Sequence, residues 1–201
     1  MTRMARADRR ALLKTGLLAA GLSLLLVGPA IARPAQPRSS RAPFTASLGS
    51  IDDGDSFSAH RPDGTRVRIR LAGIDAPERT QAWAGVARRR LAVLLDVRSL
   101  KIVPLKTDPW GRFVALVEAD GTDPAEAMLE AGLAWHFTRY DRDLTPERRA
   151  RYAAAQARAR AAHLGLWQEA APEAPWDFRR RARDRQATDA DAARILWRSV
   201  S

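Results

Sequence analysis

The chain has 201 residues, no cysteine, three histidines and a formal charge of +11. Without cysteine, disulfides, thiolate zinc sites and cysteine nucleophiles are excluded, and three scattered histidines disfavour a zinc or redox-metal enzyme. The length favours one domain with terminal extensions, and the charge points to a polyanionic partner: nucleic acid, an anionic membrane surface or an acidic polysaccharide. Part of the charge lies in residues 1–32, and the remainder is only mildly basic.

Residues 1–32 have the three-part layout of a secretory signal peptide. Basic residues precede an apolar run from Thr15 to Val27, and Ala30-Ile31-Ala32 provides small residues for cleavage. The run is too short to span a bilayer, which takes about 20 helical residues, although an uncleaved anchor is the alternative. "DRRALLK" at 8–14 resembles a twin-arginine motif and slightly favours that route over general secretion. We expect an exported, periplasmic or extracellular protein without stable membrane insertion after signal removal.

The next segment, residues 33–44, combines proline, serine and arginine without apolar periodicity, which is typical of a flexible linker. A folded domain is expected over residues 45–168. Short strands are predicted at 44–51, 56–61, 65–71, 99–105 and 112–118. "RPDG" at 61–64 favours a tight turn between the second and third strands, and the hairpin-like spacing favours antiparallel pairing.

Three helices are predicted among and after these strands, at 81–95, 124–131 and 145–163. For the last, Thr145 is a suitable N-cap, Pro146 suits the first helical position and Gly165 ends the segment. Few helices and hairpin-like strands do not fit a doubly wound parallel sheet. The pattern therefore predicts a mainly β, α+β fold: a small closed barrel with helices packed on it.

Residues 169–201 contain proline, alternating charge and few apolar residues, so a charged, loosely docked or disordered tail is expected. Within it, "FRRRARDR" at 178–185 has two interpretations. The run either contacts phosphates or forms a solvated surface, and the second is favoured.

Acidic residues provide the first candidates for chemistry. Asp55 begins the second strand, and the third strand ends at Arg70 and leads to Asp75, so antiparallel pairing brings these three residues together. Neighbouring carboxylates repel each other unless a positive charge lies between them. Two aspartates with a backbone carbonyl and waters form an ordinary site for a hard divalent cation.

Arginines and a glutamate complete the candidate set. The guanidinium groups of Arg70, and of Arg112 in the turn "DPWGR", match the paired oxygens of a phosphodiester undergoing hydrolysis. The alternative for Arg70 is a solvent-exposed side chain, and the alternative for Arg112 is a turn residue without a functional role. Glu78 either orients or deprotonates a water or caps the helix that starts near Gln81.

Five motifs together resemble the staphylococcal-nuclease-like, or thermonuclease, family: "DGDS", "RLAGIDAPE", "DPWGR", "GLAW" and "ARAAHLGLW". They occur in the family's order over residues 45–168. The resemblance implies a five-stranded OB-type closed barrel with about three helices. It also implies a calcium-dependent nuclease that cuts the 5′ P–O bond of DNA and RNA and leaves 3′-phosphates.

The resemblance also implies roles for individual residues. Metal ligands would be the carboxylates of Asp55 and Asp75 and the main-chain carbonyl of Ala76, with Asp53 supporting them from behind. The phosphate-binding residues would be Arg70 and Arg112, and Glu78 would position or activate water. Trp110 and Tyr140 would stack on bases, unless they are core aromatics.

Two functions from different classes remain. The first is a secreted or periplasmic metal-dependent nuclease, a monomer that hydrolyses phosphodiester bonds of DNA and RNA with little sequence preference. The alternative is a non-catalytic OB-fold protein that binds single strands or another polyanion, for which paired acids would be unnecessary.

Overall fold

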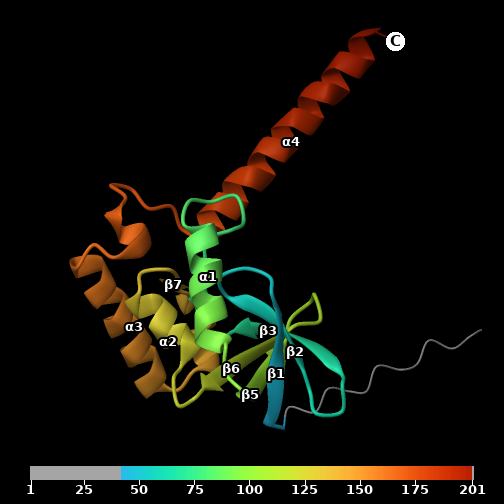
Figure 1. The fold of residues 1–201 in the computed structure, drawn as a ribbon. Coiled ribbons are helices and arrows are strands. Elements are labelled where there is room, and N and C mark those ends of the chain that lie inside the picture. The colour runs from blue at the N-terminus through green and yellow to red at the C-terminus, as the bar shows by residue number, and fades with distance from the viewer. Residues whose placement is uncertain (1–41, 201) are drawn as a thin grey trace, which may run out of the picture. The chain divides into compact units, whose positions relative to one another are not determined.

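A computed structural model describes residues 42–200. Its centre is a closed five-stranded barrel of β1 (Phe44–Ile51), β2 (Ser56–His60), β3 (Arg66–Leu71), β6 (Phe113–Ala119) and β5 (Leu100–Thr107), in that order (Figure 1). The predicted α+β class and OB-type barrel are confirmed. The predicted signal peptide and nearly all of the predicted linker lie outside the described residues.

Four of the five pairings within the barrel are antiparallel, as the spacing predicts, and the β3–β6 pairing is parallel. The antiparallel pairing that the spacing favours therefore does not extend to this pair. Between β3 and β6 the chain passes through helix α1 (Ala84–Leu95) and then β5, and this long connection allows β6 to run in the same direction as β3.

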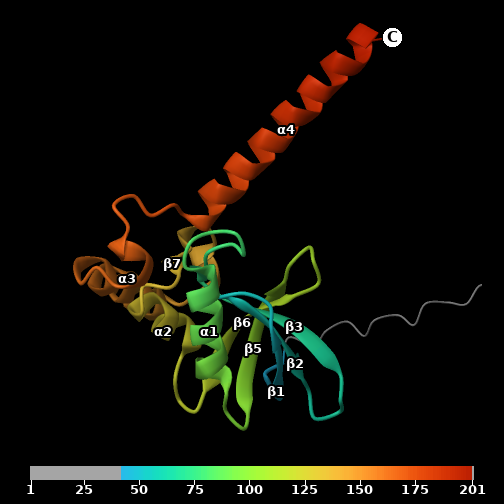
Figure 2. The same cartoon turned by 45° about the horizontal axis from the view of Figure 1, so that its top comes forward.

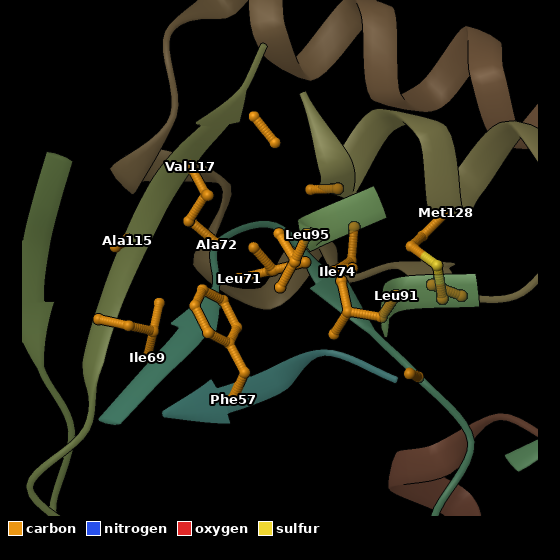
Figure 3. Close-up of a cluster of buried hydrophobic side chains, with 14 of the residues drawn as sticks. Phe57, Ile69, Leu71, Ala72, Ile74, Leu91, Leu95, Ala115, Val117 and Met128 are labelled. Atoms are coloured by element: carbon orange, nitrogen blue, oxygen red, sulfur yellow. The ribbon is translucent and has the colours of Figure 1, made fainter. Parts of the chain in front are cut away.

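The core fills the barrel because alternate residues of the strands point inward. Phe57, Ile69, Leu71 and Ala115 are at most 1% exposed and belong to the same core cluster as Leu95 of α1, which lies beside Leu71 (Figure 3). Full burial of each large apolar side chain stabilises the fold by about 1.5–3 kcal/mol. The strand ends that carry the candidate residues are thus held by a rigid interior.

Helices α1, α2 (Pro124–Glu130) and α3 (Pro146–Ala161) lie together on one side of the barrel in both views (Figures 1 and 2). The N-cap of α3 is confirmed, because the Thr145 hydroxyl accepts a hydrogen bond from the Arg148 N–H. Short elements that the sequence did not reveal complete the domain: β4 (Ile74–Asp75), β7 (Trp135–His136), and the 3-10 turns η1 (Thr138–Asp143) and η2 (Gly165–Gln168).

A fourth helix, α4 (Pro175–Val200), forms most of the segment for which a charged, loosely docked or disordered tail is expected. The disordered alternative is wrong, because the segment has good helix formers and no proline or glycine after its first residue. Pro175 occupies the first position, and Asp177 adds a negative charge to the first turn. In the described part of the chain, no helix has the length and apolar character needed to cross a membrane.

Candidate active site

The site is built on a carboxylate pair at the edge of the barrel. Antiparallel pairing of β2 and β3 places Ser56 opposite Arg70, so Asp55 lies beside the end of β3. Arg70 Nη1 donates to Asp55 Oδ1 at 2.7 Å, and Nη2 donates to Asp75 Oδ1 at 2.9 Å. Asp55 and Asp75 are only 2% and 0% exposed. One guanidinium thus bridges two buried carboxylates, and the predicted juxtaposition is present.

Additional donors hold Asp55 in place. The Ser56 hydroxyl donates to its Oδ1 at 2.7 Å, and the Ala76 N–H donates to its Oδ2 at 3.0 Å. Burial alone would raise the pKa of Asp55, but the Arg70 charge and these hydrogen bonds outweigh it and lower the pKa. Asp55 is therefore held as an anion, the form in which a carboxylate binds a cation.

Asp53 lies behind this pair, and its Oδ1 accepts a hydrogen bond from the Asp55 N–H at 3.0 Å. Burial, followed by the nearby Asp55 charge, raises the pKa of Asp53 to about 6. Its position fits a residue that shapes the Asp55 backbone from outside the carboxylate pair.

Arg112 reaches the same site from the turn before β6. Asp108 fixes it by accepting from Arg112 Nε at 2.7 Å and from the Arg112 N–H at 2.9 Å. Arg112 Nη1 donates to Ser56 Oγ at 3.2 Å, and that hydroxyl donates to Asp55. The alternative of a turn residue without a functional role therefore does not fit Arg112, because a continuous chain of hydrogen bonds joins it to Asp55 of the carboxylate pair.

Glu78 follows β4 and lines the same cavity, with its side chain 36% exposed. The Glu78 N–H donates to Gln81 Oε1 at 2.8 Å. Helix α1 begins later, at Ala84, with Trp83 as its N-cap and no side-chain capping hydrogen bond. The alternative role of Glu78 as a helix cap is therefore wrong, and its carboxylate faces the site.

Helix α4 contributes a residue that the sequence did not predict. Arg179 Nη2 donates to Asp75 Oδ2 at 2.6 Å, and Arg179 Nη1 donates to Asp75 Oδ1 at 3.2 Å and to Glu78 Oε1. The solvated-surface interpretation of residues 178–185 is wrong for Arg179. The available signal was the helical spacing of Trp176 and Arg179, which places an aromatic anchor one turn before this arginine.

A cavity of about 640 Å³ is lined by the charged residues Asp53, Asp55, Arg70, Glu78, Arg112 and Arg179, together with Trp110 and Tyr140. Trp110 is 71% exposed and Tyr140 is 52% exposed, so the core-aromatic alternative is wrong for both. Lys106 Nζ lies 4.0 Å from the centre of the Tyr140 ring. The cavity therefore combines guanidinium groups, carboxylates and accessible ring faces, which suits an anionic ligand that carries flat aromatic groups.

Comparison with known proteins identifies similar chains. The family model described as "Staphylococcal nuclease homologue" matches residues 68–169. The chain is 31% identical over 152 residues to a micrococcal nuclease of Shigella flexneri, covering 71% of this chain and 84% of that protein. It is 29% identical over 150 residues to an uncharacterized endonuclease of Haemophilus influenzae, covering 75% and 81%.

Plant proteins are also similar. A probable staphylococcal-like nuclease of Oryza sativa subsp. japonica is 39% identical over 143 residues, covering 69% of this chain and 37% of the relative. The chain spans 33% to 38% of the length of the plant relatives that it matches.

Proposed function

We propose a function on this premise: the chain belongs to the staphylococcal nuclease family. Its relatives include nucleases and support a nuclease activity. In finer terms, the chain hydrolyses phosphodiester bonds of DNA and RNA with little sequence specificity and needs one divalent cation, for which calcium is the family-based expectation. The supporting observation is a cavity lined by Asp55, Arg70, Glu78 and Arg112. At this cavity Arg70 bridges Asp55 to the fully buried Asp75.

The donor set fits a hard divalent cation. Asp55 and Asp75 supply carboxylate oxygens. Ala76 directly follows Asp75 in the chain, is 5% exposed and lines the cavity. No group of three or more histidine, cysteine or acidic side chains arranged for a metal occurs within residues 42–200. A cation at the carboxylate pair would be held by the two aspartates, the Ala76 carbonyl and oxygens of water or phosphate, as the family resemblance implies. When bound, it would supply positive charge beside a phosphate oxygen.

The two arginines provide the remaining positive charge for the substrate. Negative charge builds on the equatorial phosphate oxygens as the attacking oxygen approaches, and planar guanidinium groups match such oxygens in pairs. Asp108 holds Arg112, and the buried aspartates hold Arg70, so neither side chain needs to be ordered when substrate binds. This preorganisation favours the transition state.

Glu78 positions the attacking water and accepts its proton. Its partial exposure allows contact with solvent, and its carboxylate lies in the same cavity as both arginines. Trp110 and Tyr140 present exposed rings on which bases stack, which accounts for weak sequence dependence because every base has a flat face.

Replacement of Glu78 by glutamine should lower the cleavage rate by about a hundredfold, because the amide keeps the shape but cannot accept a proton. The rate should be measured in single-turnover cleavage of denatured DNA with excess Ca²⁺. Glu118→Gln is the matched control, since Glu118 is a half-buried glutamate on β6, outside the cavity, that pairs with Lys101. Near-normal turnover in Glu78→Gln would remove Glu78 from the mechanism.

A cation-dependence assay separates the nuclease from the polyanion-binding alternative. With denatured DNA, Ca²⁺ should give shortened fragments, and excess chelator should leave the DNA intact while the protein stays folded by circular dichroism. Repeating the assay with Mg²⁺ and Mn²⁺ identifies the preferred ion, and mapping the product ends identifies the bond that breaks. DNA shifted but uncut in every tube would favour the non-catalytic binder.

The setting of this activity is also a proposal. The layout of residues 1–32 supports export, by the twin-arginine or the general secretory route, to the periplasm or outside the cell. The released protein acts as a monomer without stable membrane insertion.

A further inference from the structure

Arg179 competes for the oxygen atoms that the proposed cation needs. Both Asp75 oxygens accept hydrogen bonds from its guanidinium group, and Asp75 Oδ1 also accepts from Arg70. Glu78 Oε1 accepts from the same guanidinium. A carboxylate oxygen engaged by an N–H donor cannot offer that lone pair to a metal ion, and a positive charge beside the oxygens also repels a second cation.

The start of α4 is anchored, so this contact is built into the domain. The Trp176 ring lies 5.5 Å from the Trp135 ring and 5.5 Å from the Phe137 ring, centre to centre. Upstream, Gln81 Nε2 donates to the Glu173 carbonyl at 3.0 Å. Because Arg179 lies one helical turn after Trp176, this aromatic contact directs its side chain toward the site.

The neighbouring arginines of α4 do not share this role. Arg180 pairs with Asp177 on its own helix at 2.8 Å and is 65% exposed, and Arg181 pairs with Glu173. The side chain of Arg179 is 35% exposed, whereas the side chain of its partner Asp75 is 1% exposed. The run of three arginines therefore places one of them on the carboxylates and leaves the other two on the surface.

We propose that Arg179 is a tethered cation that occupies Asp75 and Glu78 when the divalent cation is scarce and must be displaced before that cation binds. This inference rests on the proposed function, because it assumes a cation site at Asp55 and Asp75. The contact is autoinhibitory. The apparent association constant for the cation equals the intrinsic constant multiplied by the fraction of molecules in which Arg179 does not cover Asp75. Because Arg179 also pairs with Glu78, the Glu78 carboxylate is released only when the cation has displaced Arg179.

Calorimetric titration of the full chain with Ca²⁺ alone, without nucleic acid, tests the competition. Arg179→Gln should tighten Ca²⁺ binding by roughly tenfold, as expected when a charge-assisted contact no longer has to break. Arg179→Lys keeps the charge but loses the planar fork, and it should give an intermediate affinity. Arg180→Gln is the matched control and should bind Ca²⁺ as the unaltered chain does. Asp75→Asn should abolish binding and so identify the site.

The outcomes separate this inference from the proposed function. Unchanged or weaker Ca²⁺ binding in Arg179→Gln, or no Ca²⁺ binding in any variant, would overturn the competition. Tighter Ca²⁺ binding in Arg179→Gln would support the competition whether or not the protein cleaves nucleic acid. Absence of cleavage would instead overturn the nuclease proposal. A melting curve for each variant checks that the folded fraction is the same in every titration.

Discussion

Replacement of Arg70 by alanine should abolish most activity and also destabilise the fold. Arg70 neutralises two buried carboxylates, and removal of one partner from a buried ion pair costs about 3–5 kcal/mol. We expect about 3 kcal/mol, because Arg179 still covers Asp75. Turnover should fall by roughly a thousandfold, through the loss of a charge directed at the phosphate. Urea denaturation and single-turnover cleavage measure the two effects separately.

Added Ca²⁺ distinguishes the two roles of Arg70. A divalent cation restores positive charge between Asp55 and Asp75, so the Arg70→Ala variant should recover stability with Ca²⁺ while its turnover stays low. Arg66→Ala is the matched control, since Arg66 is an exposed arginine on the same strand and should change neither quantity appreciably. Full activity in Arg70→Ala would contradict the phosphate-binding role.

The barrel and the carboxylate pair could be predicted from the sequence because both depend on local patterns. Alternation of apolar residues locates β3, and the turn at 61–64 sets its register with β2. That register alone brings Asp55 near Arg70. Asp75 then follows within a few residues, so no long-range information is required for this half of the site.

Other contacts depend on tertiary structure that no short pattern encodes. Arg179 reaches Asp75 because Trp176, one helical turn earlier, packs on two aromatic residues from the β7 region. The spacing of Trp176 and Arg179 can be read from the sequence, but the surface on which Trp176 packs cannot. The two-residue strands β4 and β7 are too short to give a periodic signal. The parallel β3–β6 pairing likewise follows from how the barrel closes.

Two motif glycines have a structural explanation that the sequence did not supply. "GLAW" contains Gly132 and "ARAAHLGLW" contains Gly165, and both have positive φ, at 63° and 55°. The Leu166 N–H donates to the Gly132 carbonyl at 2.8 Å, so the two segments touch backbone to backbone. A Cβ at Gly165 would lie 2.2 Å from the Gly132 carbonyl oxygen. The contact joins the segment after α2 to the segment after α3.

Gly132→Ala should therefore be among the most destabilising single substitutions in this domain. Its added Cβ would lie 2.2 Å from the Leu164 carbonyl oxygen and 2.9 Å from Trp167 Cδ1, and the backbone oxygen cannot move without breaking the contact between the two segments. We expect a loss of at least about 4 kcal/mol, above the usual range for a point substitution. The measurement is the urea midpoint at constant slope.

Gly64→Ala isolates the part of this cost that comes from backbone conformation. Gly64 also has a positive φ, 81°, but an added Cβ there would meet nothing within 4 Å. Its replacement should cost only the left-handed strain, about 1–2 kcal/mol. The difference between the two variants measures the steric contact alone. Equal losses would mean that the segments after α2 and α3 separate easily, and that the two motif glycines serve the backbone conformation rather than the contact.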